Sequence, residues 1–185
     1  MVRPAVAGDI PAILHLIAEL ATYEREPDAV EATEATLGEA LFGADPAVFA
    51  HVAEHDGKVV GCAVWFVSFS TWTGRHGVYL EDLVVLQEYR GYGYGKQLLA
   101  ELARIAVSRG YTRVDWTVLD WNEPAIGFYR AVGARPMDGW TGYRLSGPEL
   151  EAFAGAAGAA TPGSVRSEAE PGPAAGARHG IRPAR

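Results

Sequence analysis

The sequence predicts an α/β domain in which helices flank a central mixed β-sheet. Three observations support this prediction: an ordinary globular composition, hydrophobic periods that alternate between strand and helix, and a glycine-rich turn where a strand runs into a helix. The 185 residues are 49% hydrophobic and 21% charged, which is enough apolar material for one sizeable core. This composition excludes a chain that is disordered throughout.

The first half of the chain alternates helical and extended patterns. Asp9 is a candidate cap for a helix with Pro11 in its first turn, and apolar residues then recur at helical spacing to Leu20. An Asp56-Gly57 pair between two apolar runs indicates a tight hairpin. In order, we expect a strand at 2–6, the helix after Asp9, a helix at 33–41, and strands at 48–54 and 58–69.

The second half continues the alternation. Gly110 follows an amphipathic stretch as a helix stop. Asn122 is placed to cap a later helix that has Pro124 in its first turn and ends before Gly133. We expect a strand at 78–86, a helix at 95–109, a strand at 114–118, a helix at 122–132 and a last strand at 143–145.

The composition changes near residue 155. Of the last 31 residues, 19 are Ala, Gly or Pro, and the only large aliphatic ones are Val165 and Ile181. Such a segment buries too little apolar surface to offset the entropy lost on ordering. The sequence therefore predicts one domain over 1–154 and a disordered tail over 155–185.

Charge and cysteine usage exclude several classes of function. The net charge of −7 disfavours nucleic-acid binding, which needs a basic face. Cys62 is the single cysteine, so neither an internal disulfide nor a cysteine zinc cluster can form, and the five histidines lack metal-ligand spacing. Residues 1–9 contain no apolar signal core, and the longest near-apolar run, 59–69, is too short to span a bilayer. We expect a cytoplasmic protein without metal, membrane or nucleic acid.

The segment from Arg90 to Lys96 is the most informative part of the chain. It reads RGYGYGK, between an extended run and an amphipathic helix. Glycines allow close approach of the backbone to an anion, and free N–H groups at a helix start favour phosphate. The spacing fails the dinucleotide-binding pattern, which needs glycine where Lys96 stands. It also fails the P-loop pattern, which needs glycine where Arg90 stands.

The remaining pattern, Arg90-x-x-Gly93-x-Gly95, resembles the signature of the GNAT acyltransferases. A second stretch, 120–134, is similar to the W-N-x-x-[AS]-x-x-F-Y-x-x-x-G-A segment of that family. Together with YLED at 79–82 and ELATYE at 19–24, it resembles the spermidine/spermine (diamine) acetyltransferase branch, which includes relatives acting on thialysine. The resemblance covers about residues 1–153 and implies the GNAT fold.

The resemblance also implies an activity and its site. It implies transfer of acetyl from acetyl-CoA to a primary amine of a small cationic acceptor, by direct attack in a ternary complex, in a homodimer. Tyr129 is the implied acid and Glu81 the implied base. The implied acceptor contacts are Tyr23, Glu24, Glu81, Asp82 and Asp138. The implied co-substrate contacts are Leu83, Val84, Val85, Arg90, Gly91, Tyr92, Gly93, Tyr94, Gly95, Lys96, Asn122 and Ala125.

The chemistry sets requirements for these residues. An alkylamine with a pKa of ~10.4 is neutral in only about one molecule in 10³ at pH 7, so a group must accept its proton. Glu81 and Asp82 are adjacent on a predicted strand, so we expect them to face opposite sides.

The nature of the acceptor stays open at this point. A polyamine needs several carboxylates along a groove, whereas a thialysine- or lysine-like acceptor also needs a cation for its carboxylate. A protein lysine or N-terminal acetyltransferase and a non-catalytic acetyl-CoA sensor stay open as alternatives.

Overall fold

The computed structural model describes residues 1–158, which divide into two units at Pro136 and Met137. The first unit contains a five-stranded sheet and four helices, and the second contains α5 (Gly147–Gly158). In chain order the elements of the first unit are β1 (Val2–Pro4), α1 (Ile10–Tyr23), α2 (Glu34–Phe42), β2 (Phe49–His55), β3 (Lys58–Ser70), β4 (Arg75–Val85), α3 (Tyr94–Ser108), β5 (Val114–Asp115) and α4 (Glu123–Ala131).

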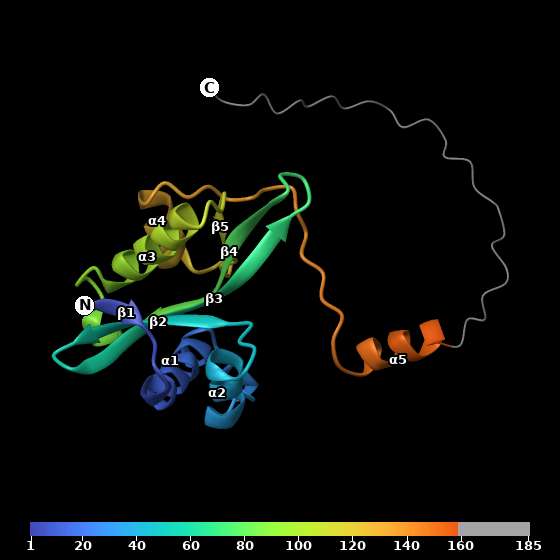
Figure 1. Ribbon diagram of the computed structural model, residues 1–185, viewed down its shortest axis with the longest axis horizontal. Helices are drawn as coiled ribbons and strands as arrows, with labels where there is room; N and C mark the ends of the chain where they lie inside the picture. Colours follow the sequence, from blue (N-terminus) through green and yellow to red (C-terminus); the bar gives the residue numbers. More distant parts are fainter. Residues whose placement is uncertain (159–185) are drawn as a thin grey trace, which may run out of the picture. The chain divides into compact units, whose positions relative to one another are not determined.

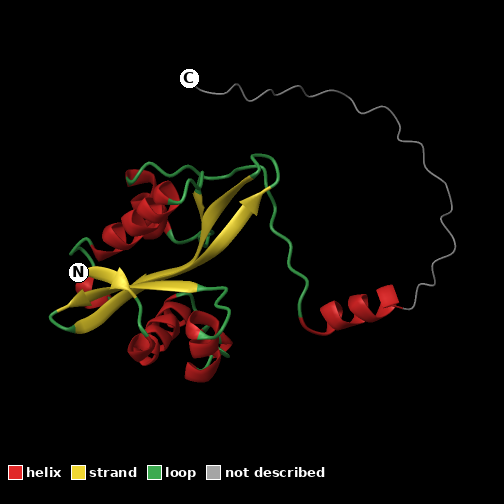
Figure 2. Cartoon of the chain, in the orientation of Figure 1, coloured by secondary structure: helices red, strands yellow, loops and turns green. Residues whose placement is uncertain are grey.

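The sheet is mixed, as the sequence predicts. Its strand order is β1-β2-β3-β4-β5, with antiparallel neighbours except for the parallel pair β4–β5. Helices α1 and α2 lie on one face of the sheet and α3 and α4 on the other (Figures 1 and 2). This arrangement confirms the predicted sheet with flanking helices.

The core lies on both faces of the middle strand. Every residue of β3 from Val60 to Trp65 is buried, because helices cover both faces of the sheet at this point. Ile13 and Leu16 of α1 and Leu98 and Leu102 of α3 are also at most 1% exposed. The helical spacing of these residues predicts which face of each helix is buried.

The β3–β4 pairing is irregular at one point. Val64 pairs with Asp82 and Trp65 pairs with Leu80, so Glu81 is an extra residue opposite the β3 strand. Such a β-bulge interrupts the regular alternation of side chains. The expectation that Glu81 and Asp82 face opposite sides rests on that alternation, so it loses its basis here. The hairpin expectation is confirmed, with Asp56 and Gly57 at φ +48° and +79° between β2 and β3.

The elements after α3 differ in part from those expected. Strand β5 has only two residues, and residues 143–145 form no strand. Helix α5 is an element that the sequence analysis missed, and the boundary predicted between residues 154 and 155 falls inside it. The predicted disorder of the tail from 159 to 185 lies outside the described residues and stays a prediction.

Asp9 does not cap α1 through its side chain. Its carboxylate accepts hydrogen bonds from Arg3 at 2.6 and 2.9 Å and from the Val6 backbone N–H at 2.8 Å. The carboxylate thereby accepts two bonds from one charged guanidinium and faces Arg3 instead of the start of α1. Arg3 also bonds Glu54 at 3.0 Å and thereby ties the start of the chain to β2.

Replacing Asp9 by Asn should lower the free energy of unfolding by about 2 kcal/mol at pH 7. The Arg3 hydrogen bonds hold the pKa of Asp9 below its usual 3.8, so its contribution is complete above that value and is lost as the pH falls through the lowered pKa. Urea unfolding at pH 7, 4 and 3 should therefore show a shrinking difference from the parent. The control Asp115→Asn removes a more exposed pair with Arg113 and should change stability by less than about 1 kcal/mol. An equal loss at every pH would contradict this role of Asp9.

Candidate active site

The glycine-rich loop has the geometry of an anion site. Gly91 and Gly93 adopt φ +85° and +83°, and Gly93 precedes α3 without any side-chain cap on the helix start. The first N–H groups of α3 are thus open, and the helix dipole favours an anion there. Lys96 lies exposed in the first turn, and Arg90 donates from Nε to the Val85 carbonyl at 3.2 Å.

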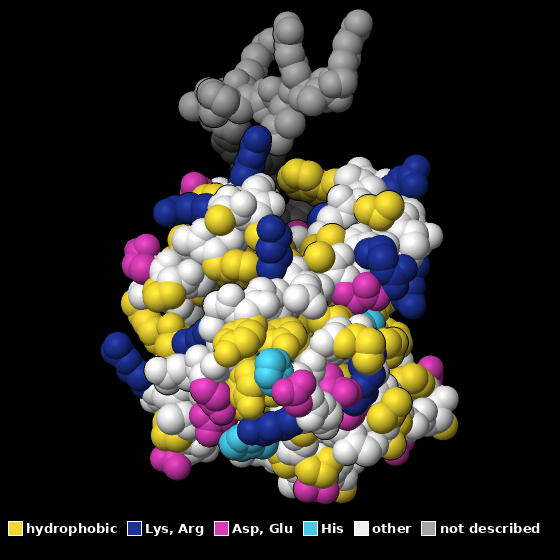
Figure 3. Space-filling view, turned by 90° about the vertical axis from the view of Figure 1, so that its left-hand side faces the viewer, with side chains coloured by type: hydrophobic (Ala, Val, Ile, Leu, Met, Phe, Trp, Pro, Cys, Tyr) yellow, Lys and Arg dark blue, Asp and Glu magenta, His cyan; other side chains and the backbone are white. Residues whose placement is uncertain are grey.

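The loop is attached to the β2–β3 hairpin through aromatic side chains. Nδ1 of His55 lies 2.6 Å from the Tyr94 hydroxyl, and the His55 ring lies 5.1 Å from Tyr89 and 5.5 Å from Tyr92. Figure 3 shows the side of the molecule that carries the hairpin, with hydrophobic side chains gathered beside a histidine. The sequence analysis missed His55. The signal that could have indicated a packed loop is the alternation of tyrosines with glycines from 89 to 95.

A cluster of acidic side chains forms where α1, β4 and α4 meet. Burial and, to a smaller extent, the charges of Glu81 and Glu24 together raise the pKa of Asp82 to about 6. Burial also raises the pKa of Glu24, at the end of α1. Burial and the Glu24 charge raise the pKa of Tyr129 on α4. Titratable groups on three segments that are far apart in the sequence therefore act on one another, because the fold places these segments close together.

Tyr129 is held by aromatic neighbours. Its ring centroid lies 4.9 Å from that of Trp116 and 5.3 Å from that of Phe128, and both Phe128 and Tyr129 pack partly against the core. Orientation on α4 therefore does not distinguish the two residues. Tyr129 differs from Phe128 in its phenol, whose pKa is raised by burial and, to a smaller extent, by the charge of Glu24.

The start of α4 is connected to the end of α1. Asn122 is buried, and its Oδ1 accepts from the Ala125 N–H at 3.3 Å, which confirms the predicted cap. The same oxygen accepts from the Tyr23 hydroxyl at 3.0 Å. The guanidinium of Arg90 stands 5.0 Å above the Tyr23 ring, so the loop also reaches this point.

Arg25 lies next to this connection, and the sequence analysis did not identify it. Its guanidinium stands 4.7 Å above the ring of Trp121, and that ring lies 5.9 Å from the ring of Tyr23. The backbone of Arg25 has a φ of +69°. The signal for Arg25 is its positive φ just after a helix. A backbone angle is visible only in the structure, so the sequence alone offered no such signal.

Other predicted site residues are distributed as follows. Glu81 is exposed at the β-bulge, and Leu83, Val84 and Val85 form the end of β4 that leads to the loop. Asp138 belongs to the second unit. The position of Asp138 as an acceptor contact stays a prediction.

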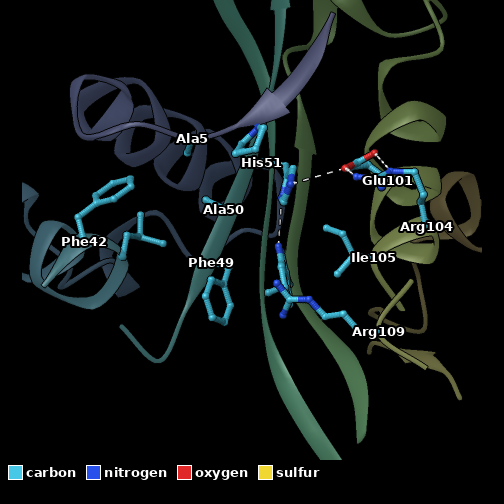
Figure 4. Close-up of a pocket in the computed structure, with 12 residues that line it drawn as sticks. Ala5, Phe42, Phe49, Ala50, His51, Glu101, Arg104, Ile105 and Arg109 are labelled. Atoms are coloured by element: carbon cyan, nitrogen blue, oxygen red, sulfur yellow. Dashed lines mark hydrogen bonds and ion pairs between the residues drawn. The ribbon is translucent and has the colours of Figure 1, made fainter. Parts of the chain in front are cut away.

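A separate pocket of about 330 Å³ opens at the edge of β2 and contains none of the predicted site residues (Figure 4). There Nδ1 of His51 accepts from Nε1 of Trp65 at 3.2 Å, and Nε2 of His51 lies 3.9 Å from Glu101. Burial lowers the pKa of His51, the charge of Glu101 opposes this, and the charges of Arg104 and Arg109 lower it further. The net lowering favours the neutral imidazole.

A metal site needs a cluster of ligating side chains, and a membrane span needs a long apolar helix. Among residues 1–158 there is no cluster of three or more His, Cys, Asp or Glu side chains arranged to hold a metal ion. Within the same part of the chain, each helix falls short of the length and apolar character that a membrane span needs.

The chain matches a family model and several known proteins. The model described as "Acetyltransferase (GNAT) family" matches residues 10–134. The chain is 38% identical over 166 residues to thialysine N-epsilon-acetyltransferase of Bos taurus, covering 84% of this chain and 97% of that protein. It is 37% identical over 159 residues to spermidine/spermine N(1)-acetyltransferase-like protein 1 of Homo sapiens, covering 80% of this chain and 23% of that protein.

A solved structure agrees with the observed architecture. An integron cassette protein from the mobile metagenome of V. cholerae superimposes with a TM-score of 0.71 at 28% identity, covering 83% of this chain and 96% of that one. The family model spans more than half of this chain, and it includes the glycine loop, the acidic cluster and Tyr129. The chain therefore belongs to the GNAT family and is an N-acetyltransferase.

Proposed function

We propose that the protein transfers the acetyl group of acetyl-CoA to a primary amine of a small cationic acceptor, with direct attack of the amine on the thioester. The observation that carries this proposal is the meeting of a protonated phenol, Tyr129, with half-buried carboxylates, Glu24 and Asp82, in one cluster. The relatives named for thialysine and spermidine/spermine support a small amine as acceptor. The homodimer that the resemblance implies and the cytoplasmic location expected from the sequence are part of the proposal.

The glycine loop fits the phosphate arm of the co-substrate. Open N–H groups at the start of α3 and the cations of Arg90 and Lys96 suit its pyrophosphate. The end of β4, at Leu83 to Val85, and the start of α4, at Asn122 and Ala125, flank this loop and would hold the rest of the arm. When bound, acetyl-CoA supplies an activated acetyl thioester.

Asp82 is the proposed proton acceptor. Its pKa of about 6 leaves the carboxylate ionised at neutral pH, and it lies closer to that of an ammonium group than an ordinary Asp pKa does. Glu24 and Glu81 add negative charge that attracts the cationic acceptor. The exposed Glu81 was the base implied by the resemblance. Burial favours Asp82 for this role and leaves Glu81 as an acceptor contact.

Tyr129 is the proposed proton donor. Its raised pKa keeps the phenol protonated, so it can donate to the sulfur of the departing thiolate. A thiolate with an ordinary pKa of ~8.5 leaves more easily when an acid is within reach. Asp82 and Tyr129 thus divide the acid and base work between two groups whose environments differ.

Asp82→Asn should lower kcat/KM for the amine about 10²- to 10⁴-fold, because the proton acceptor is lost. In the parent, kcat/KM should rise as the pH passes about 6, where Asp82 loses its proton, and the variant should lose this rise. Glu81→Gln is the matched control. It should lower kcat/KM by less, and its kcat/KM should still rise near pH 6. CoA release measured from pH 5 to 9 tests this. A larger loss in Glu81→Gln would return the base role to Glu81.

Tyr129→Phe should reduce kcat about 10²-fold while the dissociation constant of acetyl-CoA stays unchanged. The Phe ring keeps the contact with Trp116, so the variant differs from the parent only in the missing hydroxyl. Calorimetry measures the dissociation constant of acetyl-CoA. Tyr111→Phe, which changes a tyrosine packed against His76, serves as the control and should retain full activity. An unchanged kcat in Tyr129→Phe would refute the donor role. Acetyl-CoA binding without turnover of any amine by the parent would support the sensor alternative.

His55→Ala should weaken acetyl-CoA binding about fivefold, because the glycine loop loses its hydrogen bond to the hairpin. The expected change is in the KM for acetyl-CoA, with kcat nearly constant. His76→Ala replaces a histidine that contacts Phe69 and Tyr111 instead of the loop, and it should leave this KM unchanged. Equal KM values for the parent and His55→Ala would show that the loop does not need the hairpin.

A further inference from the structure

Arg25 occupies a position where glycine is usual. The N–H of Glu26 bonds the carbonyl of Ala21 at 2.9 Å, and the N–H of Arg25 bonds that of Thr22 at 3.2 Å. This pair of bonds is the Schellman ending of a helix, whose left-handed residue is most often glycine. Among residues 1–158 only Arg25 and the hairpin residue Asp56 adopt positive φ without being glycine. Backbone strain of this kind is concentrated at functional sites, so Arg25 is a candidate functional residue.

The guanidinium of Arg25 is held in place but has no acidic partner among residues 1–158. It stands over the Trp121 ring at 4.7 Å. Within the described part of the chain it forms no ion pair, whereas Arg3, Arg104 and Arg113 each bond a carboxylate. Its fork of N–H donors is therefore available to an anion from outside the chain.

The location of Arg25 connects this cation to the acidic cluster. Arg25 directly follows Glu24, whose charge acts on both Asp82 and Tyr129. Its platform, Trp121, directly precedes Asn122, which bonds Tyr23. A fixed cation thus stands at the margin of a site that is otherwise acidic.

We infer that Arg25 binds the carboxylate of an amino-acid acceptor while the distal ammonium of the same molecule enters the cluster of Glu24 and Asp82. This inference rests on the proposed function and narrows its acceptor to an amino acid with a terminal amine. Besides its α-ammonium group, such a molecule carries a carboxylate and a distant ammonium, and the site offers a cation for the first and carboxylates for the second. A guanidinium can bind a carboxylate through two parallel hydrogen bonds.

Arg25 also acts against diamines and polyamines. These molecules carry only positive charges, so a cation at the margin of the site repels the end that is not being acetylated. Specificity then arises from an attraction to one class and a repulsion of the other. The Trp121 ring holds the guanidinium before the acceptor arrives, which reduces the entropy lost on binding.

The test compares acceptors that differ only in the carboxylate. Lysine is paired with cadaverine and ornithine with putrescine, and kcat/KM is measured by CoA release for the full chain and for Arg25→Gln. The parent should prefer the amino acids. Arg25→Gln should lower kcat/KM for lysine and ornithine 10- to 100-fold, leave it equal or higher for the diamines, and leave the KM for acetyl-CoA unchanged.

Two further variants make the result specific. Arg109→Gln removes another arginine that stands over a tryptophan, Trp65, away from the acidic cluster, and it should keep the amino-acid preference. Arg25→Gly relieves the positive φ, so it should melt at an equal or higher temperature than the parent and still lose the preference. A loss of activity through unfolding is thereby separated from a loss of recognition.

Each other outcome overturns the inference in a distinguishable way. Equal losses for lysine and cadaverine in Arg25→Gln would remove its role as a carboxylate contact. A higher KM for acetyl-CoA with unchanged acceptor preference would assign Arg25 to a phosphate of the co-substrate. A parent that acetylates diamines in preference to amino acids would overturn the inference and retain the proposed function. A parent that acetylates no amine would overturn both.

Discussion

The pairing of β3 with β4 is the constraint on which the rest of the site depends. The two strands approach closely where Gly61 faces β4, since a Cβ at Gly61 would lie 2.8 Å from the Val84 carbonyl. Just before this contact the bulge inserts Glu81, and Asp82 follows half-buried at the acidic cluster. Beyond it, β4 ends at Val85 and the chain enters the glycine loop. One strand therefore determines both where the carboxylate stands and where the anion site begins.

Like charges close together make the acidic cluster unfavourable when it is empty. Asp82 is half-buried beside Glu24 and Glu81, and its raised pKa reflects the free energy spent in keeping it ionised there. A cationic acceptor offsets this repulsion. Burial first, and this repulsion second, bring the pKa of Asp82 closer to neutrality, where a base is most useful. The carboxylates that attract the substrate thus also contribute to the proton-transfer properties of Asp82.

Two aromatic rings lie between two cations along the junction of α1, α4 and the loop. Arg90 stands over Tyr23, Tyr23 contacts Trp121, and Trp121 carries Arg25. The Tyr23 hydroxyl adds a bond to Asn122, the cap of α4. These contacts join the proposed co-substrate loop to the margin of the proposed acceptor site. A substitution at one of these residues can therefore alter the binding of both substrates.

By itself, the sequence determined the order of the elements from β1 to α4, the hairpin at Asp56-Gly57, the cap at Asn122 and the strand–loop–helix unit around Gly93, because these depend on local periods and turn chemistry. It did not determine that Asp9 bonds Arg3 instead of capping α1, nor that the bulge falls at Glu81, because both depend on partners distant in the chain. Only the tertiary structure decided the environment of Asp82, the hold of His55 on the loop and the stacking of Arg25 on Trp121. Burial, charge and ring contact are properties of neighbours in space, and the spacing of residues along the chain does not specify them.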